Sequence, residues 1–353
     1  MKKREFGLGV KLTATLLMFA VLLVGMEMGS RIYWRANDIV PIRYPEYILH
    51  SIYRGISWLD AKPPSRSDDR LDILLLGGSV LHSQYGAVQV YLGERLRNEG
   101  FKNFKIHNLS AKGHMSRDSF LKYRALKDAE FDLVVVYHGI NDSRANNVPT
   151  ELFDQDYNHF QWYEVANLLS PYHMNSTFSL PYTMRYLAVR VRQKLNAEQY
   201  VSFGGPNKAW LSYGEDIKSK DSFRNNLNAI VEISRQRSDP LLLMTFASHL
   251  PADYSLERFK QKQLDYAKHI SPVEIWGTPT FVKTAIEAHN EVVKDVAITN
   301  PDLFFIDQAK LLSEGGGRVF NDICHFTTLG SIAYVDNIFD SVLNAPAFSR
   351  FKN

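Results

Sequence analysis

The sequence has few residues with which to cross-link its fold. Its 353 residues include a single cysteine, Cys324, so no disulfide can form within the chain. No internal repeat or low-complexity segment is evident. Acidic and basic residues nearly balance: residues 1–35 hold six Lys/Arg and two Asp/Glu, and the rest of the chain holds 35 and 36. We therefore expect no basic nucleic-acid-binding face and no nucleic-acid partner.

Long hydrophobic runs are also scarce, and the one that stands out lies near the amino terminus, from Leu12 to Met26. Such a run is typical of either a signal peptide or a membrane-spanning helix. No small-residue cleavage site follows it. Lys11 and Glu27 flank the run about 24 Å apart along a helix, so both charges can reach the interfaces of a bilayer. We therefore expect an uncleaved signal anchor over residues 1–35.

The flanks of this run predict its orientation. Three basic residues at positions 2–4 precede it, and the aromatic pair Tyr33 and Trp34 follows it, as in an interfacial belt. This pattern favours a cytoplasmic amino end with the body on the outer side. Two of the three N-glycosylation sequons, at Asn108 and Asn141, fall at the expected active edge, where a glycan would be disruptive, so we expect a bacterial inner membrane with the body on its periplasmic side. Residues 36–70, with scattered prolines and a polar run, are expected to be a linker.

Residues 71–346 are predicted to form one domain in which strands and helices alternate. The apolar runs suited to strands are 72–76, 105–109, 131–137, 241–246 and 303–307. The segments with helical spacing are 86–98, 116–127, 222–236, 280–297 and 331–343. This alternation indicates βαβ units and a parallel sheet in an α/β fold.

Residues 150–220 interrupt the alternation. They are rich in aromatic residues and hold no clear strand. Because long excursions from compact domains are usually lids or binding loops, we interpret this stretch as an insertion that covers the active edge of the sheet. Its rings can form a platform for substrate, or they can pack the core of a helical subdomain.

The predicted strands end in turns that carry polar residues. Ser79 follows two glycines at the end of the first strand, Gly113 lies in the turn after the second, and Asn141 follows the third. The carboxyl ends of parallel strands meet at the edge where open α/β sheets bind ligands. Ser79 can be a nucleophile at this edge, or it can simply cap the next helix.

A base for this serine is available near the carboxyl end of the chain. Asp322 and His325 lie three residues apart, just before the last predicted helix. At this spacing the carboxylate can hold one ring nitrogen while the other faces a serine. Together with amide donors at the strand ends, these residues supply what acyl transfer to Ser79 requires.

These segments resemble the four sequence blocks of the SGNH (GDSL-like) hydrolases in order and approximate spacing. The blocks here are Gly77-Gly78-Ser79, Asn108 with Gly113, Gly139-Ile140-Asn141-Asp142, and Asp322-Ile323-Cys324-His325. The resemblance is to the membrane-anchored bacterial type, and it departs at one position, because the family usually has Asp where Gly78 stands.

The resemblance implies a flavodoxin-like three-layer α/β/α fold with Ser79 as nucleophile, His325 as base and Asp322 as the group that orients the base. It also implies an oxyanion hole formed by the Ser79 amide, the Gly113 amide and the Asn141 side chain. The block residues expected to support these groups are Gly78, Asn108, Gly139 and Asp142.

The expected function is a serine esterase that acts on O-acyl groups, such as acetyl, of a cell-envelope or exported carbohydrate. An O-acyltransferase with the same triad, or an inactive carbohydrate-binding or assembly protein, remains an alternative. No cofactor and no metal are expected, because the histidines near the strand ends match no ligand motif: His82, His107, His114 and His138. Cys324 is interpreted as a buried filler rather than a second nucleophile.

Overall fold

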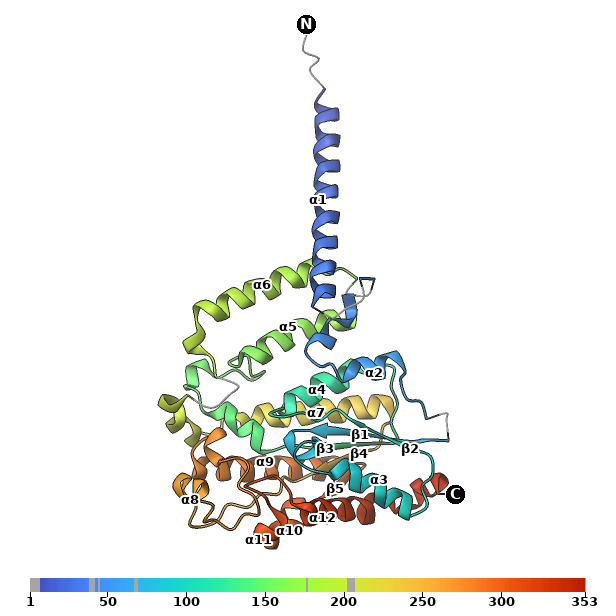
Figure 1. The fold of residues 1–353 in the computed structure, drawn as a ribbon. Helices are drawn as coiled ribbons and strands as arrows, with labels where there is room; N and C mark the ends of the chain where they lie inside the picture. Colours follow the sequence, from blue (N-terminus) through green and yellow to red (C-terminus); the bar gives the residue numbers. More distant parts are fainter. Residues whose placement is uncertain are drawn as a thin grey trace.

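The computed structural model describes residues 7–37, 42–43, 45–66, 69–175, 177–201 and 207–352. Its body is an α/β sandwich from which one long helix projects (Figure 1). The strands are β1 (Leu71–Gly77), β2 (Phe104–Asn108), β3 (Leu133–Tyr137), β4 (Leu241–Met244) and β5 (Phe304–Ile306). All are parallel, in the order β2-β1-β3-β4-β5. This is the flavodoxin-like order, which confirms the predicted fold class.

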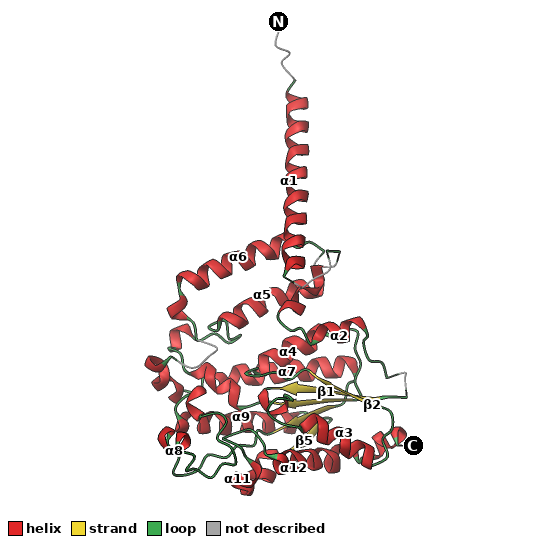
Figure 2. Cartoon of the chain, viewed as in Figure 1, coloured by secondary structure: helices red, strands yellow, loops and turns green. Residues whose placement is uncertain are grey.

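The helices are α1 (Leu8–Ala36), α2 (Ile56–Ala61), α3 (Val88–Asn98), α4 (Ser116–Ala125), α5 (Gln161–Asn175), α6 (Leu180–Leu195), α7 (Ser219–Arg237), α8 (Leu256–Lys260), α9 (Pro279–Thr299), α10 (Gln308–Leu312), α11 (Gly316–Val319) and α12 (Thr328–Ile338). The central sheet lies between helical layers, with α3 and α12 against one face and α4 and α7 against the other (Figure 2).

The strands are continuously apolar because both faces of the sheet are buried. Alternate residues of β1 point in opposite directions: Ile73 and Leu75 pack with α3 and α12, whereas Leu74 and Leu76 pack with α4 and α7. The chain leaves β1 through α3 on one face and enters β3 from α4 on the other. The carboxyl ends of β1 and β3 therefore border the crevice in which such sheets bind ligands.

Helix α1 is long and apolar enough to cross a membrane, the one such helix among the residues that the structure describes. Its 29 residues extend about 43 Å at 1.5 Å per residue. Most of the helix stands clear of the body (Figure 1). Near its carboxyl end, Ser30 and Trp34 are buried against α6.

The expectation that residues 36–70 form a linker is wrong for the part from 45 to 61. The turn η1 (Pro45–Ser51) and helix α2 lie against the body, and η1 packs on α5. Their apolar side chains join the core on the α4 side of the sheet: Ile48, Leu49, Tyr53, Ile56 and Leu59. Prolines and polar residues surround these buried side chains in the sequence. The composition of the stretch therefore resembles that of a linker.

The insertion at 150–220 joins the edge of the sheet to the base of α1. Helix α5 packs on η1 and α4, and α6 packs on α5 and α1. Closer to the sheet, Tyr157, Phe160 and Tyr163 form a separate cluster with Met115 from the loop before α4. The described part of the insertion thus builds an additional layer between the sandwich and α1 (Figure 1).

Truncation of a core residue in η1 should destabilise the protein. Leu49 is fully buried, so Leu49→Ala is expected to lower the free energy of unfolding by about 2–5 kcal/mol. Trp58 on α2 is 80% exposed, and Trp58→Ala should change it by less than about 1 kcal/mol. Urea unfolding of the full chain in detergent measures both. Equal stabilities for the two variants would contradict the packing of this segment.

Candidate active site

Ser79 stands at the point where β1 turns into η2 (Ser79–Leu81) and is 5% exposed. Its amide is the first of the turn, so it has no acceptor within the turn. The Asn108 side chain holds this turn against the end of β2: its Nδ2 donates to the Leu81 carbonyl at 2.8 Å, and its Oδ1 accepts from the Ser110 amide at 2.9 Å. The position of the Ser79 hydroxyl is thus set by two neighbouring strands.

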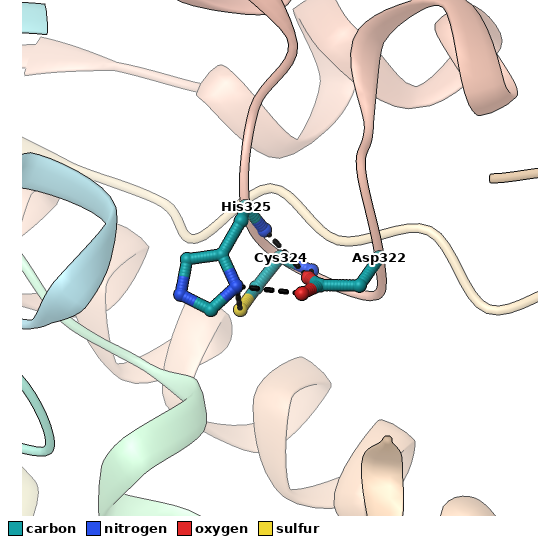
Figure 3. A group of neighbouring side chains, drawn as sticks. All are labelled: Asp322, Cys324 and His325. Carbon is teal, nitrogen blue, oxygen red and sulfur yellow. Dashed lines mark hydrogen bonds and ion pairs between the residues drawn. The ribbon is translucent and has the colours of Figure 1, made fainter. Parts of the chain in front are cut away.

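The structure brings Ser79, His325 and Asp322 together as a hydrogen-bonded chain. The Ser79 Oγ lies 2.8 Å from His325 Nε2, and His325 Nδ1 lies 2.7 Å from Asp322 Oδ2. Figure 3 shows the imidazole and the carboxylate facing each other across the turn that carries both. With Nδ1 donating to the carboxylate, Nε2 is the acceptor that can take the serine proton.

Backbone amides fix the Asp322 carboxylate. Its Oδ1 accepts from the amides of Cys324 and His325, each at 2.9 Å, and its Oδ2 accepts from the Ser271 amide at 2.9 Å. The first two bonds arise because the tight turn points its amides back at the carboxylate, as in an Asx turn. Asp322 therefore has one orientation, and that orientation presents Oδ2 to the histidine.

A stacked ring holds the imidazole from the side. The Tyr85 ring lies 4.7 Å from the His325 ring, centroid to centroid, at an interplanar angle of 23°. The Lys112 ammonium lies 5.7 Å from the centroid of the same tyrosine ring. Tyr85 thus connects the base to the loop after β2, in which Gly113 lies.

The expected oxyanion donors lie around the same turn. Gly113 has a φ of 73°, a left-handed conformation suited to glycine, and its amide donates to no acceptor among the described residues. Asn141 Nδ2 donates to the His114 carbonyl at 2.9 Å, and its Oδ1 accepts from Trp276 Nε1 at 2.8 Å. The indole fixes which way the amide points, so its second N–H remains available for substrate.

The geometry explains the unusual glycine before the serine. A Cβ at Gly78 would lie 2.5 Å from Asn141 Nδ2 and 3.2 Å from the His114 carbonyl oxygen. Any larger residue would push the Asn141 amide away from the backbone next to Ser79. Gly139 has a separate packing reason, because a Cβ there would lie 2.5 Å from the Cβ of Phe246.

Asp142 is buried beside the site and ties three elements together. Its carboxylate accepts from the Ser116 amide at the start of α4, from the Ser116 hydroxyl at 2.5 Å, and from the Tyr157 hydroxyl at 3.1 Å. Burial raises the pKa of Asp142 to about 7, although these hydrogen bonds oppose the shift. Asp142 therefore supports the loop that carries Asn141.

A buried lysine lies beside the loop that holds Gly113 and His114. Lys122 Nζ donates to the Leu109 carbonyl and to His114 Nδ1, the latter at 2.9 Å. Burial lowers the pKa of Lys122 to about 8, and burial together with this lysine lowers that of His114 to about 4. His114 is thus a neutral acceptor near pH 7, and its ring anchors the loop from below.

The other histidines make separate contacts. His107 lies 2.6 Å from an Asp72 oxygen and His138 lies 2.7 Å from the Ser119 hydroxyl, so each is bonded to a different part of the core. Among the described residues, the one group of metal-ligating atoms that converge is Asp322, Cys324 and His325, within 4.8 Å of one another.

The atoms of that group that could bind a metal already contact one another. His325 Nδ1 faces the carboxylate, and the Cys324 sulfur lies 3.7 Å from the same nitrogen (Figure 3). Burial raises the pKa of the Cys324 thiol well above its usual range, so it stays protonated and is a poor ligand and nucleophile.

Three residues of the site escaped the sequence reasoning: Tyr85, Ser271 and Trp276. They contact His325, Asp322 and Asn141 respectively. Each contact depends on the fold and no local motif marks it. Only Tyr85 could have been suspected from the sequence, because it lies six residues after Ser79.

A cavity of about 720 Å³ lies on the α1 side of the loop that holds Gly113. Lys112 and His114 form part of its wall, and most of the other lining residues come from α1, η1, α5, α6 and the segment 197–201. Its aromatic lining comes from Tyr33, Trp34, Phe160, Trp162, Tyr186 and Tyr200. The site and this cavity therefore share the loop that holds Gly113.

No protein-family model matches the chain, and no curated protein matches its sequence. Solved structures that are similar include a GDSL-like lipase from Bacteroides thetaiotaomicron, at 12% identity and a TM-score of 0.45, covering 83% of this chain and 97% of that one. An acetyl xylan esterase is similar at 14% identity and a TM-score of 0.42, covering 77% of this chain and all of that one.

An acetylxylan esterase from Geobacillus stearothermophilus is similar at 14% identity and a TM-score of 0.39, covering 77% of this chain and 93% of that one.

Adding one methyl group at Gly78 should impair catalysis through Asn141. We expect Gly78→Ala to lower kcat for p-nitrophenyl acetate about 10²–10³-fold with little change in KM, as for loss of one oxyanion donor. The control is Gly93→Ala on α3, where the new Cβ would be no closer than 3.7 Å to its neighbours. Wild-type kcat in a folded Gly78→Ala variant would refute this role of the glycine.

The buried Asp142 carboxyl should make stability depend on pH. Its folded pKa of about 7 exceeds the ordinary 3.8, so the folded state holds a proton that the unfolded state releases between these values. Stability therefore falls as pH rises from about 4 to about 7. Asp142→Asn should lack this decline, whereas Asp253→Asn, at an exposed carboxyl, should keep it. Denaturant unfolding across this range tests the difference, and parallel curves for Asp142→Asn and wild type would exclude it.

Proposed function

We propose that this chain is a serine esterase of the SGNH type that hydrolyses O-acyl groups through an acyl-enzyme on Ser79. The observation that carries the proposal is the hydrogen-bonded chain Ser79–His325–Asp322, at 2.8 and 2.7 Å. These three groups meet at the carboxyl edge of a parallel sheet, next to donors suited to an oxyanion. This is the arrangement that acyl transfer to serine requires.

In the first half of the reaction, Ser79 Oγ attacks the carbonyl carbon of the ester while His325 Nε2 takes the hydroxyl proton. Asp322 Oδ2 holds Nδ1–H and stabilises the imidazolium that forms. The oxyanion receives hydrogen bonds from the amides of Ser79 and Gly113 and from Asn141 Nδ2. The imidazolium then returns its proton to the departing alcohol oxygen, which leaves an acyl group on Ser79.

In the second half, His325 Nε2 takes a proton from water, and the hydroxide oxygen attacks the acyl carbon. The same donors hold the second oxyanion, and Ser79 leaves with the proton from His325. A sugar hydroxyl in place of water would convert hydrolysis into acyl transfer, so product analysis in the presence of acceptor sugars separates an esterase from an O-acyltransferase.

The substrate class that we propose is an acylated carbohydrate, such as an O-acetylated envelope or exported polysaccharide. The support is the aromatic lining of the cavity that adjoins the site through Lys112 and His114, although Ser79, His325 and Asn141 are not among its lining residues. Aromatic rings stack on the apolar faces of sugars, and Lys112 and Arg190 offer hydrogen bonds to hydroxyls. We further propose that α1 anchors the chain in a bacterial inner membrane with residues 71–346 as one catalytic domain on the periplasmic side.

The proposed nucleophile is tested by covalent labelling and steady-state kinetics. A fluorophosphonate probe should label the full chain, and Ser79→Ala should abolish labelling, whereas Ser313→Ala, at a serine bonded to the Lys310 carbonyl, should not. Asp322→Asn is expected to lower kcat for acetyl esters about 10⁴-fold without loss of fold. Labelling that survives in Ser79→Ala, or an Asp322→Asn variant of undiminished activity, would disprove the mechanism.

A further inference from the structure

The outward face of α6 carries a continuous apolar stripe. Met184, Leu187, Val191 and Leu195 are all exposed and recur at intervals of three and four residues, so they lie on one side of the helix. A helix on the surface of a soluble domain normally places polar residues on such a face. The stripe therefore marks a surface that meets something other than water.

The opposite face of α6 is the one that packs on the protein. Tyr182 is buried there, and Gln193 Nε2 donates to the Gln161 carbonyl at 2.9 Å and to Glu164 on α5 at 2.7 Å. With α5 below α6 in Figure 1, the stripe points away from the sandwich, toward the side from which α1 projects. Helix α6 is thus amphipathic with its polar contacts turned inward.

Basic residues flank the stripe. Arg185 and Arg192 are one heptad apart and lie along one border, where Arg192 also pairs with Glu164 of α5, and Lys194 lies along the other. No Asp or Glu occurs within α6. An apolar stripe with basic borders is typical of a helix that lies in the interface of a membrane with anionic lipids.

The start of α6 is fixed to α1 at the end of its apolar run. Glu27 of α1 accepts from the amides of Ser179 and Leu180 at 2.8–3.0 Å, so it caps the first turn of α6. Ser30 bonds to Ser179 and Thr183, and Trp34 Nε1 donates to Thr183 at 2.6 Å. These contacts set α6 sideways to α1 (Figure 1).

Helix α6 begins at the depth where a bilayer around the apolar run of α1 would end. The apolar run of α1 from Leu12 to Met26 extends about 22 Å, and Lys11 at its start can snorkel to the interface of a hydrocarbon core of roughly 30 Å. Glu27 follows at once, so a bilayer around this run would end where α6 begins. An apolar groove of about 600 Å³ continues from α1 to α6 at this level, lined by residues such as Val24, Phe178 and Pro181.

We propose that α6 is a membrane-interface helix, which lies flat on the bilayer with its apolar stripe among the lipid headgroups and upper acyl chains. Together with α1 it holds the body in one orientation. The cavity lined by α5, α6 and the base of α1 then lies close to the membrane surface. The same cavity reaches the Gly113 loop through Lys112 and His114. This proposal rests on the α1 anchor and is independent of the esterase chemistry.

The test uses the full chain in vesicles of phosphatidylcholine and phosphatidylglycerol, with the fluorophore NBD attached to single introduced cysteines. Cys324 is fully buried, so unsubstituted protein serves as the control for labelling. Leu187→Cys and Val191→Cys report on the stripe. Leu17→Cys reports on α1, and Leu311→Cys, exposed on α10 at the far end of the body, is the matched control (Figure 1).

We expect nitroxide lipids, and not aqueous iodide, to quench the labels on the stripe and in α1, with the reverse at Leu311→Cys. In the Leu187→Cys background, Val191→Asp should reduce lipid quenching at the label, because a charge in the stripe opposes burial in lipid. Ile298→Asp, at an exposed apolar residue of α9, should leave it unchanged.

Three results would overturn the proposal. Iodide quenching of the stripe with lipid quenching at Leu17→Cys would show that α1 is inserted but α6 is solvated. Protection of the NBD label from both quenchers, together with a disulfide-linked dimer when unlabelled Leu187→Cys protein is treated with a mild oxidant, would show that a second copy covers the stripe. Iodide quenching at Leu17→Cys would show that α1 is not inserted in the bilayer. The labelling test of Ser79 does not depend on this result.

Discussion

The candidate site depends on one hydrogen bond, between His325 Nε2 and the Ser79 hydroxyl at 2.8 Å. It joins residues 246 positions apart, and it forms only because the turn after β1 and the turn before α12 meet at the same edge of the sheet. The parallel sheet supplies this edge, since its strands all end there. Each further contact of the site restrains one partner of this bond: backbone amides hold Asp322, Tyr85 stacks on the imidazole, and Asn108 braces the serine turn.

The buried polar groups around the site act as a frame. Asp142 accepts hydrogen bonds from the start of α4, and the Lys122–His114 hydrogen bond fixes the loop that holds Gly113. In a dry interior, unpaired polar groups are costly, so these contacts resist displacement of the loops they join. The frame also extends outward, because Tyr157 and the rest of its cluster belong to the insertion that reaches α1 through α5 and α6.

Much of this architecture was accessible from the sequence. The five strands follow from apolar runs that a doubly covered sheet requires, and Ser79, Asp322 and His325 follow from blocks at the ends of predicted elements. The packing of η1 and α2 was missed, because a short apolar segment among prolines has no periodicity to separate it from a linker. Tyr85, Ser271 and Trp276 were out of reach, since their contacts are made by tertiary packing alone. The reason for Gly78 likewise needed the position of the Asn141 amide.

The central claim is that Ser79 carries the acyl group during turnover. The most direct measurement is mass spectrometry of proteolytic peptides after acid quench of the full chain during hydrolysis of p-nitrophenyl acetate. We expect one acetyl group on the peptide that contains Ser79, and its absence from that peptide in His325→Ala. Steady hydrolysis with no acetyl group on Ser79, or with the acetyl group on Cys324 or Lys112 instead, would contradict it.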